Sequence, residues 1–220
     1  MKKDYTHITV VLDRTGSMES IRDDTIGGFN AFLNKQKTEP GTATMTLVQF
    51  DSQDPYEIVH RFKPIAEVTE LTRESYVPRA STPLLDAIGR AINDLEHSLT
   101  ELKADDRPAK VVMVVVTDGQ ENSSREFRKD QIEKMIKEKT EKNDWQFVFL
   151  SADLAAIGDA KAVGFFANAV LLYEKSSKGS ADAWASLSNQ TSAYRSSRKG
   201  KLGFDPGDRK HPDDPAKKKA

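Results

Sequence analysis

Two stretches of aliphatic residues that each lead to an aspartate constrain the fold of this chain most strongly. Residues 8–12 read Ile-Thr-Val-Val-Leu and stop at Asp13, and residues 111–116 read Val-Val-Met-Val-Val-Val and lead through a threonine to Asp118. A strand that is apolar along its whole length is typically covered on both faces, as in a parallel sheet between helices. We therefore expect both stretches to be central strands with an acid at the carboxyl end.

The rest of the chain alternates between strand and helix patterns. Apolar residues three and four positions apart mark a helix after Asp13 and, most clearly, another from Leu85 to Leu102. The polar connection Asp51–Pro55 is too short to contain a crossover helix, so the strands that it joins form an antiparallel pair. The expected strands cover residues 5–12, 43–50, 56–62, 111–116, 147–150 and 169–173.

This order predicts an α/β fold, a doubly wound, mostly parallel six-stranded sheet with one antiparallel edge strand and helices on both faces, as in Rossmann-like proteins. Such sheets bind ligands beyond the carboxyl ends of the strands, where the winding direction reverses. Asp13 and Asp118 lie at such ends, and Thr82 precedes a helix that enters from the same edge. Three separate segments are therefore expected to meet at one place.

The residues at this edge have the chemistry of a cation site. Asp13, Thr15 and Ser17 place oxygen ligands at alternate positions of one loop, and carboxylate and hydroxyl oxygens suit Mg²⁺, Mn²⁺ or Ca²⁺. Taken singly, Ser17 and Thr82 could only cap helices, and Asp118 could begin a turn. Two carboxylates about 5 Å apart repel by on the order of 3 kcal/mol, however, and a divalent cation would remove this repulsion.

The three loops resemble the metal-binding loops of von Willebrand factor type A (vWA) domains, which form a metal-ion-dependent adhesion site (MIDAS). The matching residues are DRTGS at 13–17, STPL at 81–84 and TDG at 117–119. The first loop fits the family pattern D-x-S/T-x-S fully, although Thr15 stands where many members have serine, and Ser81 stands where glycine often precedes the threonine. The resemblance covers roughly residues 3–195 and is closest to stand-alone bacterial and phage members.

The resemblance implies that Thr15, Ser17 and Thr82 coordinate a cation through their hydroxyls, and that Asp13 and Asp118 act directly or through water. Mg²⁺ is the expected ion, with Mn²⁺ and Ca²⁺ as alternatives. One coordination position would remain open for an aspartate or glutamate of a partner protein. The expected function is therefore metal-dependent protein–protein interaction rather than catalysis.

Two other functions remain open at this point. A magnesium-dependent, phosphatase-like hydrolase could use the same acids, but the sequence offers no well-placed general base and no phosphate-binding Gly-Lys-Ser/Thr loop. An assembly scaffold could use the metal only to stabilise its fold. Arg14, inside the first loop, is expected either to be solvated or to face the acid of a partner.

Composition limits the partners and the compartment. The chain has 33 Lys and Arg against 34 Asp and Glu, a balance that favours neither nucleic acid nor a membrane surface as the partner. There is no cysteine and no signal-peptide pattern, and no apolar run approaches the roughly 20 residues that span a bilayer, so we expect a cytoplasmic protein. We expect residues 1–197 to form the vWA domain and residues 198–220 to be a disordered basic tail.

Overall fold

In the computed structural model of the protein, which describes residues 2–217, a six-stranded sheet has the strand order β3-β2-β1-β4-β5-β6. The neighbouring strands are parallel except β2 and β3, which pair antiparallel at one edge. This arrangement confirms the predicted fold class. The strands are β1 (Lys2–Asp13), β2 (Thr42–Phe50), β3 (Glu57–Pro64), β4 (Pro108–Thr117), β5 (Gln146–Ser151) and β6 (Val170–Leu172).

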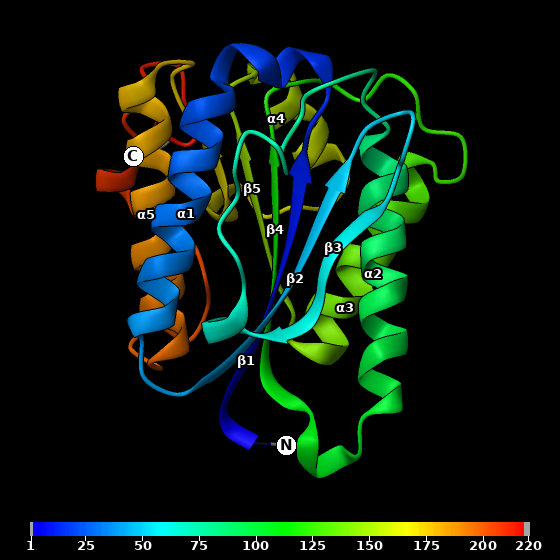
Figure 1. Ribbon diagram of the computed structural model, residues 1–220, viewed down its shortest axis with the longest axis vertical. Helices are drawn as coiled ribbons and strands as arrows, with labels where there is room; N and C mark the ends of the chain where they lie inside the picture. Colours follow the sequence, from blue (N-terminus) through cyan, green and yellow to red (C-terminus); the bar gives the residue numbers. More distant parts are fainter. Residues whose placement is uncertain (1, 218–220) are drawn as a thin grey trace.

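Helices cover both faces of the sheet (Figure 1), with α1 and α5 side by side on one face and α2 and α3 on the other. The helices are α1 (Arg22–Thr38), α2 (Leu84–Glu101), α3 (Lys129–Asn143), α4 (Leu154–Ala162) and α5 (Ser177–Arg195). Each face has its own apolar core, since Val10 and Leu12 of β1 pack toward α1 and α5 whereas Val11 between them packs toward α2. None of the helices within residues 2–217 is long and apolar enough to cross a membrane.

The winding of the chain reverses between β1 and β4. From β1 the chain crosses to β2 on one side, and after β3 and α2 it returns to β4 on the other side of β1. The two strands run parallel with Leu12 opposite Val116, so that Asp13 and Thr117, the next residues, end the strands at the same level. The predicted ligand-binding edge is therefore formed by the two apolar strands with acids at their ends.

Residues 198–217 lie against the domain, which corrects the expectation of a disordered tail for this part of the chain. Leu202 and Phe204 are only 3% and 5% exposed and belong to the core on the side of α1 and α5. The segment is rich in glycine, proline and charged residues, so its few buried apolar side chains could not be recognised from the sequence. The end of the expected tail, 218–220, lies outside the described residues.

A buried ion pair fixes the same segment to the edge of the sheet. One guanidinium nitrogen of Arg209 lies 3.0 Å from each carboxylate oxygen of Asp214, and both side chains are at most 5% exposed. The same nitrogen donates to the carbonyl oxygen of Val170 in β6 over 2.9 Å. The segment thus provides hydrogen-bond donors for the outer strand as well as apolar side chains for the core.

Candidate metal centre

The first loop leaves the sheet at Asp13, whose side chain turns back onto the loop. The backbone N–H of Thr15 donates to Oδ1 of Asp13 over 2.6 Å, a local contact that aspartate forms readily in turns. Below the loop, the fully buried Tyr76 donates its hydroxyl to the carbonyl oxygen of Asp13 over 2.5 Å. A short 3-10 helix then begins at Gly16 and leads into α1, so the loop is held at both ends.

Three hydroxyl groups from two loops converge above this edge of the sheet. Oγ1 of Thr15 lies 3.2 Å from Oγ of Ser17 and 3.3 Å from Oγ1 of Thr82. The hydroxyl of Ser17 also donates to Oδ1 of Asp118 over 2.6 Å, which adds the third loop to the cluster. Neighbouring oxygen ligands of an octahedral Mg²⁺ site lie about 3 Å apart, because metal–oxygen bonds are about 2.0–2.1 Å long. The hydroxyl spacing fits such an ion.

Gly119 lies directly beside two of these hydroxyls. A Cβ atom at this position would lie 3.2 Å from Oγ of Ser17 and 3.5 Å from Oγ1 of Thr82. A side chain here would therefore crowd both hydroxyl oxygens. The hard oxygen donors fit a divalent cation, with the two aspartates supplying negative charge. Within residues 2–217, this edge included, no three His, Cys, Asp or Glu side chains are grouped so that they could hold a metal.

Asp13 and Asp118 at this edge are buried and have little positive charge near them. Burial raises the pKa of Asp13 to about 7, and repulsion from Asp118 adds to this effect. Hydrogen bonds from the Thr117 hydroxyl, at 2.5 Å, and from Thr15 act in the opposite direction and lower the pKa of Asp13. Among the side chains of residues 4–217, Lys175 is the only lysine or arginine that forms an ion pair with either acid, and its Nζ lies 2.7 Å from Oδ2 of Asp118. Neither Thr117 nor Lys175 was a candidate from the sequence.

The second and third loops are tied together by residues that no sequence motif indicates. The backbone N–H of Thr82 donates to the side-chain oxygen of Asn122 over 2.8 Å, and the backbone N–H of Asn122 donates back to the carbonyl oxygen of Thr82 over 3.1 Å. The carboxylate of Glu121 accepts from the backbone N–H groups of Leu85 and Ser124 over 2.8 and 2.7 Å. These contacts hold the start of α2 against the loop after β4.

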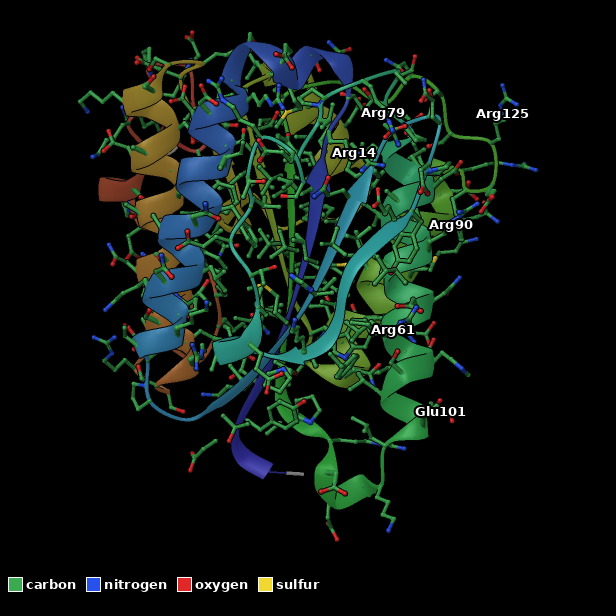
Figure 2. All side chains as sticks on the ribbon, viewed as in Figure 1. Arg14, Arg61, Arg79, Arg90, Glu101 and Arg125 are labelled. Carbon is green, nitrogen blue, oxygen red and sulfur yellow. The ribbon has the colours of Figure 1, made fainter. Side chains whose placement is uncertain are left out.

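Arg14 is buried beneath the edge, which corrects the expectation that it is solvated or faces a partner. Its guanidinium donates to Asp51 over 2.7 Å, to Gln49 over 3.3 Å and to Glu57. Asp51 also accepts from Arg79 over 3.0 Å, and Figure 2 shows Arg14 and Arg79 at the upper edge where the parallel strands end. Burial opposes ionisation of Asp51, but the hydrogen bond from Arg14 and those from nearby amides outweigh it and hold the Asp51 pKa below its ordinary value.

Comparison with known proteins supports the fold. No protein-family model matches the sequence, and no curated protein does. Solved structures do match, among them a von Willebrand factor type A protein from Catenulispora acidiphila, with a TM-score of 0.59 and 10% identity over 86% of this chain and 43% of that one. The chain therefore has the fold of a vWA domain, as the three loops predicted.

Two further matches carry functional descriptions. The proximal thread matrix protein 1 of the mussel byssus, with a zinc-occupied MIDAS motif, has a TM-score of 0.59 and 13% identity over 87% of this chain and 47% of that one. The pilus adhesin SpaC of Lactobacillus rhamnosus GG, in its open conformation, has a TM-score of 0.64 and 12% identity over 87% of this chain and 30% of that one. This chain thus spans less than half the length of each of these proteins.

Proposed function

We propose that this chain is a metal-dependent protein–protein interaction module that binds an acidic side chain of a partner through a divalent cation. The observation that carries the proposal is the convergence of the Thr15, Ser17 and Thr82 hydroxyls, 3.2 and 3.3 Å apart, beside two buried acids. The zinc in the MIDAS motif of the byssus protein supports a divalent ion in this fold. Mg²⁺ is the ion that we expect.

The donor set explains why such a site would favour a carboxylate ligand. In this proposal Thr15, Ser17 and Thr82 hold the cation through oxygens that carry no full charge, and Asp13 and Asp118 neutralise it. A bound cation supplies a positive centre at the edge of the sheet, and a site with mainly neutral ligands keeps its attraction for an incoming Asp or Glu.

We also propose that the chain is not an enzyme. The adhesin and the matrix protein among its structural matches support an adhesive role over catalysis by a hydrolase. The absence of cysteine from the sequence supports the cytoplasm as the compartment.

Calorimetric titration with Mg²⁺ and Mn²⁺ tests the metal site. We expect the wild-type chain to bind, and we expect Asp13→Asn and Ser17→Ala to reduce the affinity at least ten-fold, because each removes a charge or a ligand oxygen. Asp130→Asn, an exposed acid in the first turn of α3, is the matched control and should bind as the wild type does. Absence of binding by the wild type would contradict the proposal.

A pull-down from a cell lysate, with Mg²⁺ or with a chelator, then tests the role of the metal in recognition. We expect a specific partner to be captured with Mg²⁺ and lost with the chelator or with Asp13→Asn. A partner that Asp13→Asn retains would indicate a scaffold with a structural metal. Metal-dependent turnover of a phosphate ester would indicate the hydrolase instead.

A further inference from the structure

We propose that the ammonium group of Lys175 is an internal cation that competes with the divalent ion for Asp118 and so lowers the metal affinity of the site. This inference rests on the proposed function and concerns how loading of that site is controlled. Nζ of Lys175 lies 2.7 Å from Oδ2 of Asp118 and 3.5 Å from the carbonyl oxygen of Ser17. The lysine therefore reaches both the third and the first of the three loops.

The two partners of this ion pair differ in their freedom to move. The side chain of Asp118 is completely buried, and its other oxygen accepts the hydroxyl of Ser17 over 2.6 Å. The side chain of Lys175 is 43% exposed. A partly exposed lysine can extend into water at small cost, whereas the buried carboxylate stays in place. The acid is thus fixed and the ammonium group can leave it.

The backbone that carries Lys175 is anchored independently of its side chain. Lys175 lies in the short connection between β6 and α5, and the next residue, Ser176, caps α5 by accepting the backbone N–H of Gly179 over 3.1 Å. Before it, the backbone N–H of Tyr173 donates to the carbonyl oxygen of Ser151 over 3.0 Å. Withdrawal of the lysine side chain therefore requires no change in the helix or the strand.

The charges at the site determine whether Lys175 raises or lowers the metal affinity. With both acids ionised, Asp13 and Asp118 carry two negative charges, and the ammonium group already neutralises one of them. A divalent cation that enters the cluster meets less negative charge and is repelled by the ammonium group. With screening by the surrounding water, this repulsion corresponds to about a ten-fold change in the binding constant.

A purely structural role of the lysine would have the opposite consequence. If Lys175 only held Asp118 in position, its removal would weaken metal binding. If it competes with the metal, its removal must strengthen metal binding. The sign of the change in affinity separates the two roles.

The experiment is a calorimetric titration of Mg²⁺ into the full chain. We expect Lys175→Met to bind Mg²⁺ about ten-fold more tightly than the wild type, and Lys175→Arg, which retains the charge, to stay close to the wild type. The matched control is Lys178→Met, because Lys178 is an exposed lysine three residues further on that pairs with Asp182. This control should leave the affinity unchanged.

A second measurement needs no metal. In the metal-free protein, Lys175→Met should melt at a lower temperature than the wild type, because Asp118 loses its counter-charge, and saturating Mg²⁺ should remove the difference. If the wild type binds Mg²⁺ and Lys175→Met binds it equally or more weakly, Lys175 does not compete with the metal. The proposed function would be unaffected by that result. Absence of Mg²⁺ binding by every variant, Lys175→Met included, would overturn both.

Discussion

Nε of Arg14 lies 2.7 Å from Oδ2 of Asp51, and this buried ion pair joins the loop after β1 to the loop after β2. Arg79, which precedes the second loop at Thr82, donates to the same carboxylate oxygen over 3.0 Å, and its backbone N–H donates to the carbonyl oxygen of Arg14 over 2.8 Å. The ion pair therefore supports two of the three loops of the candidate metal centre from below.

Arg14→Met should lower the free energy of unfolding by roughly 3 kcal/mol, because it leaves a buried carboxylate with one of its two cations. Urea unfolding followed by circular dichroism measures the loss. Arg73→Met is the control, since Arg73 and its partner Asp23 are both mostly exposed, and it should change little. Equal losses in the two variants would show that the buried pair has no special role.

Gly119→Ala should weaken Mg²⁺ binding about ten-fold with little effect on folding. The added Cβ would lie 3.2 Å from the Ser17 hydroxyl, and at this distance a neighbour has to move, so the hydroxyls proposed to hold the cation would shift. Gly158→Ala is the matched control, because nothing lies within 4 Å of a Cβ at that position. The readout is Mg²⁺ titration, and wild-type affinity in Gly119→Ala would refute this placement of the site.

Two adjacent glycines of α1 should respond differently to alanine. A Cβ at Gly28 would lie 2.0 Å from the Trp184 ring, so Gly28→Ala must displace the tryptophan from between α1 and α5 and should cost about 1–3 kcal/mol of stability. Nothing lies within 4 Å of a Cβ at Gly27, so Gly27→Ala should stabilise the helix by up to about 1 kcal/mol. Thermal unfolding distinguishes them, and a change of the same sign in both would contradict this packing of the helices.

Removal of the Phe204 ring should destabilise the domain. Phe204 is 5% exposed and lies in the core, so Phe204→Ala should cost about 3 kcal/mol, whereas the control Phe166→Ala, at a residue that is 57% exposed, should cost much less. Truncation after Lys199 should likewise lower the melting temperature, because it removes Leu202 as well. An unchanged melting temperature would restore the expectation of a tail that is independent of the fold.

His7 should make stability depend on pH. Burial lowers its pKa to about 3, well below the ordinary value of the unfolded chain. Below about pH 6.5 the unfolded state therefore binds a proton that the folded state does not, and stability falls as the pH falls. From pH 7 to pH 5 this group alone should remove about 2 kcal/mol.

His7→Gln should abolish that part of the pH dependence, because glutamine does not titrate. Urea unfolding of both proteins at pH 7 and pH 5 gives the difference, in which the contributions of the other groups cancel. His97→Gln, at an exposed position on α2, should retain the wild-type pH dependence. If the unfolding free energy of His7→Gln depended on pH as that of the wild type does, His7 would not be the group that causes the pH dependence.

The fold class and the edge of the sheet at which the loops meet could be predicted from the sequence alone. Both follow from local patterns, since an apolar run such as Val111–Val116 has to be covered on both faces. The chain order of the elements then leaves few ways to arrange the sheet. The same reasoning predicted that Asp13, Thr82 and Asp118 would lie close together, and the hydrogen bonds among the three loops place them there.

The other side chains that surround this edge could be identified only in the folded structure. Lys175 contacts Asp118 across 57 residues of sequence, and Arg14 contacts Asp51 across 37. No periodicity encodes such pairs, because they depend on how completed helices and strands pack. Phe204 is a similar case. It is a single aromatic residue in a charged segment, and its place in the core depends on contacts with residues that are distant in the sequence.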